Sequence, residues 1–227
     1  MSSKGFKQQL FDQFARIAKA MANGYRLELL EFLAQGERSV ESLSEVSGLS
    51  IANTSQHLQR LRQAGLVTTR TQGHKVIYRL ANQDIMEMLD VLRRIGERNL
   101  AEVDRLVDSY LHDKDKLDPV SANDLLIKIQ TGEVTVLDVR PKLEYEAGHL
   151  PGAVNVPLKQ LALQLDKFPP QSQVVAYCRG PYCALAFEAV ELLREQGFQA
   201  SRLEYGLPEW VLAGHPVENG SESKNNL

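Results

Sequence analysis

The sequence predicts two domains, the first mainly helical with one β-hairpin and the second an α/β domain with a parallel sheet. In residues 1–113, apolar residues recur at helical spacing and are interrupted by one β-rich hairpin. In residues 120–218, strand-like runs alternate with helical ones, a rhythm typical of a parallel sheet. A charged segment ending in Pro, residues 114–119, is interpreted as the linker, and residues 219–227 as a disordered tail.

Helix signals in the first domain occur in a definite order. Ser39 and Ser50 are typical N-caps, and Gly48 lies between the two helices that they begin. The runs 67–70 and 76–80 are β-rich and predict a hairpin joined by residues 71–74. Two short helices followed by a basic hairpin indicate a winged helix-turn-helix. The predicted helices cover residues 6–21, 27–33, 39–47, 50–64 and 84–112.

The helix over 50–64 is the candidate DNA-reading helix. Between Val46 and Gln83 the sequence has no Asp or Glu, and an acid-free basic stretch is typical of nucleic-acid binding. Amide and guanidinium groups on the exposed face would read base edges, and the hairpin residues would contact phosphates. For His57, helix packing and phosphate contact are both open. The face expected to be buried consists of Ile51, Thr54, Leu58 and Leu61. The candidate DNA-binding residues are Ser50, Asn53, Ser55, Gln56, His57, Gln59, Arg60, Arg70, Lys75 and Arg79.

The segments Ala18–Leu27, Gly48–Leu58 and Leu61–Val67 resemble the ArsR family of bacterial repressors, over roughly residues 6–112. The resemblance implies a homodimer that binds double-stranded operator DNA and pairs through terminal helices, here the helix at about 84–112. Its apolar stripe could instead pack only within its own domain. Metal-sensing members carry cysteines on the helix before the DNA-reading one. Residues 39–46 contain no Cys or His, so no metal site is expected.

Both cysteines lie in one segment of the second domain, Tyr177–Cys183. The apolar run before it predicts a strand, and the stretch 184–196 predicts a helix. Cys178 would therefore end a strand in a tight loop that opens a helix, where unpaired N–H groups and the helix dipole stabilise a thiolate. The sequence thus predicts a reactive cysteine. The other expected strands are 134–139 and 200–203, and the other expected helices are 122–129 and 158–165.

The motifs Leu137–Arg140, Glu144–Ala153 and Tyr177–Cys183, followed by Gly206–Trp210 and Ala213–Val217, resemble a single-domain rhodanese over roughly residues 120–218. The resemblance implies that Cys178 accepts a sulfane sulfur as a persulfide and passes it to a thiol acceptor. Asp138 and Arg140 would support the loop, and Arg179 would add positive charge. The backbone cradle for the terminal sulfur would consist of Arg179, Gly180, Tyr182, Cys183 and Ala184.

Two positions at the end of this segment bear on its chemistry. Phosphatase and arsenate reductase loops of this kind need an arginine six residues after the cysteine, and position 184 is Ala, which disfavours oxyanion chemistry. Cys183 has two readings of equal weight. It is a candidate resolving thiol that attacks a persulfide on Cys178, or a small buried residue at the start of the helix.

Three functions are compatible with this combination. The first is a DNA-binding regulator whose operator affinity is modulated by sulfur on Cys178. The second is a thiosulfate or polysulfide sulfurtransferase that uses the DNA-binding module for targeting, and the third, ranked last, is a soft-metal or arsenite sensor. No apolar run approaches the roughly 18 residues of a membrane span, and the first residues are not typical of a signal peptide. A cytoplasmic protein without a cofactor is expected, with a small sulfur donor as partner.

Overall fold

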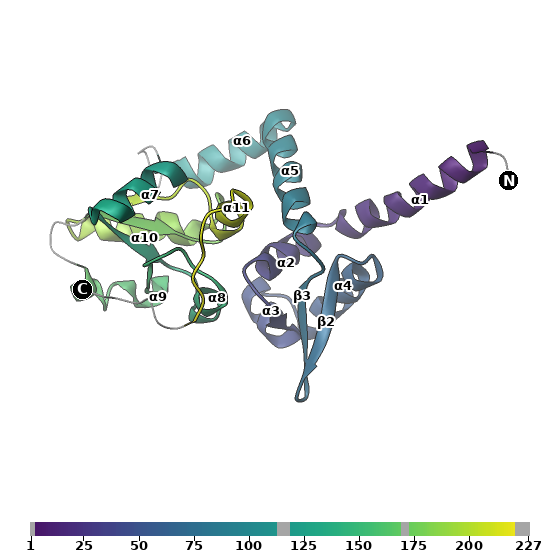
Figure 1. Cartoon of the computed structure of the whole chain (residues 1–227), viewed down its shortest axis with the longest axis horizontal. Helices are drawn as coiled ribbons and strands as arrows, with labels where there is room; N and C mark the ends of the chain where they lie inside the picture. The colour runs from purple at the N-terminus through teal and green to yellow at the C-terminus, as the bar shows by residue number, and fades with distance from the viewer. Residues whose placement is uncertain (1–2, 113–118, 169–172, 221–227) are drawn as a thin grey trace. The chain divides into compact units, whose positions relative to one another are not determined.

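The computed structural model describes residues 3–112, 119–168 and 173–220 (Figure 1). The chain divides into two compact units, Met1–Leu89 and Asp90–Leu227. The division falls inside helix α5 (Asp84–Asn99), whereas the sequence places the domain boundary at 114–119. The division is earlier because side chains in the second half of α5 contact the second unit. Residues 114–118 of the expected linker lie outside the described residues.

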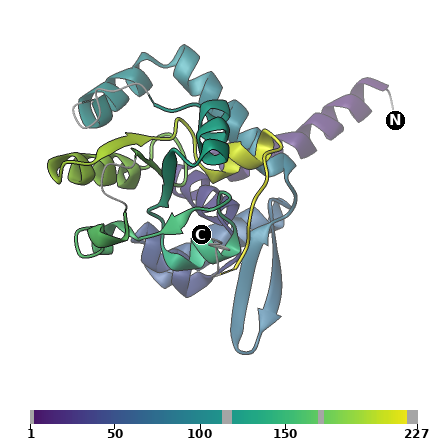
Figure 2. The ribbon, with the colours of Figure 1, turned by 60° about the vertical axis from the view of Figure 1, so that its left-hand side comes forward.

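The first unit is a helical domain with a three-stranded antiparallel sheet in the order β1-β3-β2. Side-chain oxygens of Ser39 and Ser50 accept hydrogen bonds from backbone N–H groups at the starts of α3 and α4, which confirms the predicted caps, and Asn23 caps α2 in the same way. The β2–β3 hairpin projects from the helices as the wing (Figure 2). The elements are α1 (Ser3–Met21), α2 (Gly24–Ala34), β1 (Arg38–Ser39), α3 (Val40–Ser47), α4 (Ile51–Gln63), β2 (Val67–Gln72) and β3 (Lys75–Leu80).

Two sequence predictions for this unit need correction. The wing strands extend further than expected, so that Gly73 and His74 alone connect them, and Gly73 has a φ of 61°, which suits glycine in a two-residue turn. Thr54, Leu58 and Leu61 are buried as predicted, but Ile51 is 55% exposed. Ile51 is the first residue of α4 and lies beyond the end of the core that the other three enter.

The predicted single helix over 84–112 is wrong, because the chain forms three helical pieces. After α5 comes α6 (Ala101–Val107), and then a π-helical turn, η1 (Asp108–His112). Leu100 between α5 and α6 has extended backbone angles, φ −117° and ψ 96°. The Asn99 side chain meanwhile donates to the Ile95 carbonyl and ends the first piece. A pattern of apolar residues is continuous across this break, so periodicity alone could not reveal it.

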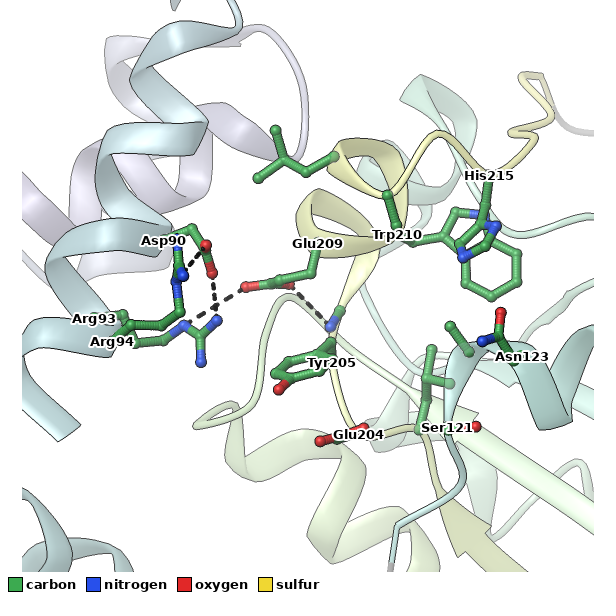
Figure 3. A pocket seen from close by; sticks show the side chains of 15 residues that line it. Asp90, Arg93, Arg94, Ser121, Asn123, Glu204, Tyr205, Glu209, Trp210 and His215 are labelled. Atoms are coloured by element: carbon green, nitrogen blue, oxygen red, sulfur yellow. Dashed lines mark hydrogen bonds and ion pairs between the residues drawn. The ribbon is translucent and has the colours of Figure 1, made fainter. Parts of the chain in front are cut away.

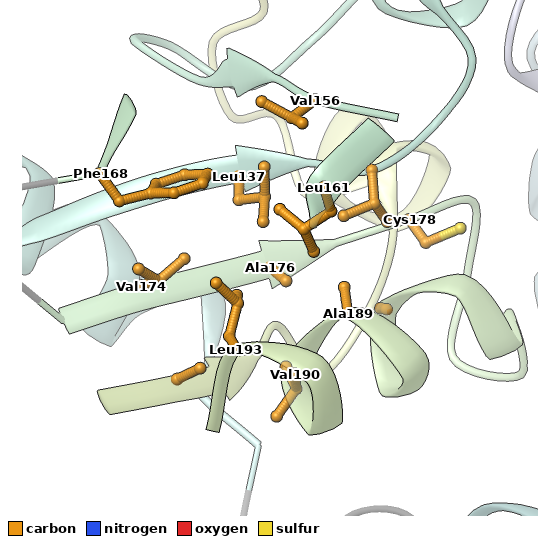
Figure 4. Packing of buried hydrophobic residues seen from close by; sticks show 13 residues of the cluster. Leu137, Val156, Leu161, Phe168, Val174, Ala176, Cys178, Ala189, Val190 and Leu193 are labelled. Carbon is orange, nitrogen blue, oxygen red and sulfur yellow. The ribbon is translucent and has the colours of Figure 1, made fainter. Parts of the chain in front are cut away.

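The second unit contains a four-stranded, fully parallel sheet in the order β5-β4-β6-β7. Alternate residues of β6 enter different cores, with Val174 and Ala176 facing α10 (Figure 4) and Val175 and Tyr177 on the opposite face with Trp210. The strands are β4 (Val134–Asp138), β5 (Val154–Asn155), β6 (Gln173–Tyr177) and β7 (Gln199–Arg202). The helices are α7 (Ala122–Thr131), α8 (Lys142–Ala147), α9 (Leu158–Leu161), η2 (Leu165–Lys167), α10 (Ala184–Glu195) and α11 (Leu207–Leu212).

Short elements of this unit differ from the sequence prediction. The helix expected over 158–165 ends at Leu161, because residues 163 and 164 bond to carbonyls three residues back and turn the chain. Strand β5 has two residues and helices α8 and α11 have six each, too few to show a strand alternation or a helical repeat, and they were not predicted. Asn219 and Gly220, assigned to the tail, are described, and the Gly220 N–H donates to the Glu146 carbonyl. Residues 221–227 lie outside the described residues.

Membrane crossing requires a long apolar helix, and the helices in the described ranges include none of that kind.

Leu137 tests the core on the α10 side of the sheet. Its side chain is fully buried, so Leu137→Ala should lower the free energy of unfolding by about 2–5 kcal/mol. Leu163 is 85% exposed, and Leu163→Ala should change it by less than about 0.5 kcal/mol. Trp210, the only Trp in the sequence, lies in the second unit, so its fluorescence in a urea titration reports on that unit. Equal effects of the two substitutions would contradict the assignment of this core.

Candidate functional site

The sulfur loop, residues Cys178–Cys183, connects the end of β6 to the start of α10. Cys178 is 2% exposed and packs in the core on the α10 side, with its sulfur at the loop (Figure 4). The sulfur atoms of Cys178 and Cys183 are joined in a disulfide, with their Cα atoms 6.2 Å apart, within the usual range for such bonds. The structure therefore brings together the two cysteines that the sequence singled out.

Backbone amides of the sulfur loop have unequal availability. The Cys183 N–H donates to the Gly180 carbonyl at 3.2 Å and closes the turn, so this member of the predicted cradle is already engaged. The N–H groups of Gly180, Tyr182 and Ala184 donate to no acceptor within the described ranges. Ala184 begins the twelve-residue helix α10, whose positive end therefore faces the loop. These amides are the groups available to stabilise a sulfur anion.

Asp138, Arg140 and Tyr177 form a buried network below the loop. The Arg140 guanidinium donates to Asp138 Oδ2 at 2.6 Å and to the Gly148 carbonyl at 2.7 Å. The Tyr177 hydroxyl donates to Asp138, and accepts from the Leu150 N–H at 3.1 Å. Burial and the neighbouring Asp138 charge raise the pKa of Tyr177 well above its usual range, so the hydroxyl remains a donor. Asp138 and Arg140 thus lie where a supporting role requires, and Tyr177 joins them.

Arg179 is paired with a glutamate that sequence reasoning missed. Its Nε lies 3.0 Å from both carboxylate oxygens of Glu144, and its Nη2 lies 2.7 Å from Oε1. Glu144 is buried, although it belongs to the short exposed-looking helix α8. The charge that the sequence assigned to the sulfur anion is therefore compensated by Glu144. The sequence did contain one indication of its importance, because Glu144 is the first residue of the rhodanese-like motif Glu144–Ala153.

Gly206 packs directly against the backbone of the sulfur loop. A Cβ atom at this position would lie 2.3 Å from the carbonyl carbon of Arg179 and 2.5 Å from the Gly180 nitrogen. No side chain fits at such distances, so glycine is required for the segment after β7 to approach the loop.

Helix α5 also contacts the sulfur loop, within the second unit. The Tyr182 hydroxyl donates to Glu97 Oε1, and Glu97 accepts from Arg93 Nη1 at 2.9 Å. Burial and the bond to Glu97 raise the pKa of Tyr182, which keeps the hydroxyl protonated. The Arg93 guanidinium lies over the Tyr205 ring, 5.3 Å from its centroid.

A cavity of about 730 Å³ opens beside these residues (Figure 3). Asp90, Arg93 and Arg94 line it from α5, and Glu209 and Trp210 line it from α11. Four of its charged groups pair with one another, since Arg94 bonds to Asp90 at 3.0 Å and Arg93 lies 4.0 Å from Glu209, and Glu204 also lines the cavity. Burial raises the pKa of Glu209. The lining thus carries three carboxylates and two guanidinium groups, so it has no surplus of positive charge for an anionic ligand.

The predicted DNA-reading face of α4 consists of exposed side chains from one helix. Asn53, Gln56, Gln59 and Arg60 are exposed, as the sequence predicts for base-reading residues. The Ser50 hydroxyl caps α4, and Ser55 is half-buried. His57 is also half-buried, with its ring centroid 6.0 Å from that of Tyr25. Burial, together with Arg26 and Arg60, lowers the pKa of His57. The His57 ring thus packs near Tyr25, and phosphate contact by His57 stays a prediction.

Two of the three wing cations are paired with Glu37. Arg70 Nε lies 2.7 Å from Glu37 Oε2, and Arg79 Nη1 lies 3.7 Å from Oε1. Lys75 is exposed at the first position of β3. Glu37 comes before the acid-free stretch, so its proximity to the wing could not be read from the sequence.

Both halves of the chain match known families. Residues 23–69 match the model of the bacterial regulatory protein, arsR family, and residues 121–213 match the rhodanese-like domain. The chain is 41% identical over 215 residues to the HTH-type transcriptional regulator Rv0324 of Mycobacterium tuberculosis. The match covers 95% of this chain and 94% of that protein. The chain is also 42% identical over 79 residues to the transcriptional activator HlyU of Vibrio cholerae, covering 35% of this chain and 73% of HlyU.

Two solved structures resemble one half each. The homodimeric winged helix-turn-helix DNA-binding domain Mb0332 of Mycobacterium bovis is 38% identical, covering 44% of this chain and 91% of that one, with a TM-score of 0.41. A rhodanese-related protein of Thermoplasma volcanium is 26% identical, covering 45% of this chain and 98% of that one, also with a TM-score of 0.41.

Fold, sequence motifs and relatives define a helix-turn-helix transcriptional regulator. The chain belongs to the ArsR family of bacterial regulators and carries a rhodanese-like domain in its C-terminal half.

Gly206→Ala tests the close approach to the sulfur loop. The added methyl should displace the Arg179–Gly180 backbone, lower the free energy of unfolding by about 1–3 kcal/mol and speed alkylation of reduced Cys178. Gly96→Ala, within α5, is the matched control. A Cβ atom there would lie 3.9 Å from Val103, which is an ordinary van der Waals distance. The substitution should stabilise α5 by up to about 1 kcal/mol. An alkylation rate unchanged in Gly206→Ala would show that the loop does not depend on this contact.

Glu37→Gln tests the wing. Removing the carboxylate releases Arg70 and Arg79, so affinity for a duplex of arbitrary sequence should rise about three- to tenfold at low salt and the rise should shrink as salt increases. Fluorescence anisotropy at several salt concentrations measures both. Glu45→Gln makes the same charge change on α3 and should have a smaller effect. Equal effects of the two variants would mean that wing pairing does not limit phosphate contact.

Proposed function

We propose that this regulator binds operator DNA with an affinity that depends on the sulfur state of Cys178. The observation that carries the proposal is the pairing of Cys178 with Cys183 in one loop at the start of α10. A buried cysteine bonded to a second cysteine five residues away forms a unit with an open and a closed form. The rhodanese resemblance supplies the chemistry, which is uptake of a sulfane sulfur.

The reaction proceeds in two steps. The Cys178 thiolate attacks the sulfane sulfur of a small donor, R–S–S⁻, forming Cys178–S–S⁻ and releasing R–S⁻. The Cys183 thiol then attacks Cys178 Sγ and forms the disulfide. The terminal sulfur leaves with the Cys183 proton as HS⁻, so the two cysteines are oxidised while the sulfane sulfur is reduced. A thiol acceptor restores the open form by thiol–disulfide exchange, which suits a reducing cytoplasm.

The DNA-binding half acts as a homodimer in this proposal. Helix α1 exposes an apolar stripe, and such a stripe on a surface helix is typical of an interface. In the second unit, α5 and α6 expose further apolar residues, which are a separate candidate surface for pairing. Base reading is assigned to the exposed face of α4, and phosphate contact to Arg70, Lys75 and Arg79. The exposed apolar residues are Phe6, Leu10, Phe11, Phe14, Ile17, Val91, Leu92, Ile95, Leu100 and Leu106.

A sulfurtransferase that uses its DNA-binding half only for targeting is the second candidate. The match of residues 121–213 to the rhodanese-like domain favours it. In that case persulfide transfer to a thiol would turn over, and operator affinity would be independent of Cys178.

Operator binding with defined sulfur states tests the proposal. The operator is first selected from random duplex DNA with reduced protein. Polysulfide treatment should then change the Kd of wild type at least about fivefold, and leave Cys178→Ser unchanged. Mass spectrometry should show loss of two hydrogens in wild type and gain of one sulfur atom in Cys183→Ser.

The Cys183→Ser protein separates persulfide from disulfide as the effective form. If polysulfide changes the Kd of wild type but not the Kd of Cys183→Ser, the disulfide is the form that alters DNA binding. If the Kd of wild type is also unchanged, the regulatory proposal fails, and turnover of thiosulfate then supports the sulfurtransferase.

A further inference from the structure

Helix α5 begins in the first unit, at Asp84, and runs without a break to Asn99 in the second unit. Because α5 is one continuous helix, a displacement of its second half also moves its first half. What holds its second half in the second unit therefore matters for the first unit. Among the described residues, the second half of α5 contacts the sulfur loop at both of its ends.

The first contact reaches the Cys183 end of the loop. Tyr182, the residue before Cys183, donates its hydroxyl to Glu97. Arg93 holds the same carboxylate from one turn earlier, at 2.9 Å, and is itself paired with Asp90 at 2.5 Å. The acceptor is thus positioned within α5 and does not need to adjust to the tyrosine. Tyr182 is 41% exposed, so the bond stands at the surface, where a small movement of the loop breaks it.

The second contact reaches the Cys178 end by a longer route. Arg93 lies over the Tyr205 ring and 4.0 Å from Glu209, whose other oxygen accepts from the Gly206 N–H at 3.1 Å (Figure 3). Gly206 in turn packs against the backbone of Arg179 without room for a side chain. The segment that supports the start of the loop therefore rests on the same arginine that positions Glu97.

We propose that the hydrogen bond from Tyr182 to Glu97 couples the sulfur state of the Cys178–Cys183 pair to helix α5. In the disulfide form, the bond between the cysteines holds their Cα atoms 6.2 Å apart and fixes the turn that carries Tyr182. Opening the disulfide removes this restraint, and Tyr182 spends less time on Glu97. The consequence for DNA binding rests on the proposed function, whereas the coupling itself does not.

Coupling is reciprocal, which makes it measurable without DNA. If the disulfide favours the contact with α5, the contact favours the disulfide by the same factor. The full-length protein is equilibrated with reduced and oxidised glutathione. Two glutathione thiols reduce the Cys178–Cys183 disulfide to two thiols and become one glutathione disulfide. Rapid alkylation and mass spectrometry give the equilibrium constant.

Tyr182→Phe and Glu97→Ala should each make the disulfide easier to reduce, by about three- to tenfold in the equilibrium constant. The double variant should have the same equilibrium constant as either single variant, because both substitutions remove the same hydrogen bond. Glu97→Gln keeps an acceptor oxygen, so its equilibrium constant should lie between those of Glu97→Ala and wild type. Glu102→Gln, on α6 and paired with Arg105, is the control and should match wild type.

Equilibrium constants within twofold of wild type in both Tyr182→Phe and Glu97→Ala would overturn the coupling. The proposed function fails on a different result, namely a wild-type Kd for operator that does not change with the disulfide. If that Kd does change, Tyr182→Phe should bring the ratio of Kd values between the two forms closer to one. A ratio that stays at the wild-type value would contradict transmission through α5.

Discussion

The buried pair of Asp138 and Arg140 is the constraint on which the second unit depends. Two charges without solvent are costly unless their hydrogen bonds are satisfied, and here Gly148, Tyr177 and the Arg140 backbone N–H supply partners. These partners come from the ends of two adjacent strands and from the turn after α8. Satisfying the pair therefore fixes the register of β4 against β6, where Asp138 faces Tyr177, and places Cys178 one residue beyond a fixed point.

Arg70 and Arg179 show how burial decides what a paired arginine can do. Each was expected to offer its charge to an anion, and each is paired with a glutamate. The pair of Arg70 and Glu37 is exposed and contributes about 0–1 kcal/mol, so a DNA phosphate can replace the carboxylate. Removing one partner from a buried pair costs about 3–5 kcal/mol, and Glu144 is buried. Arg179 therefore stays on Glu144, and a sulfur anion on Cys178 depends on backbone amides and the α10 dipole.

Local signals explain which features could be predicted. The caps at Ser39 and Ser50, the hairpin and the strand before Cys178 depend on neighbouring residues, and the structure confirms them. The break at Leu100 was missed because the apolar pattern continues across it. Glu37 and Glu144 were missed because each lies 33 or more residues from its arginine, and sequence spacing does not show such proximity. The position of the site was thus predictable, but its electrostatics depended on tertiary pairs.

Two cysteines give the sulfur loop a property that one cysteine lacks. A persulfide on Cys178 adds one atom to a loop lined by amides, but it leaves the two ends of the loop unconnected. A disulfide with Cys183 instead fixes the distance between the two ends of the loop, so the loop has two discrete geometries. Signals travel through elements with discrete alternatives, because each state then favours a different set of contacts. Tyr182 belongs to this loop and contacts α5, so the step most suited to transmission is closure by Cys183 rather than sulfur uptake by Cys178.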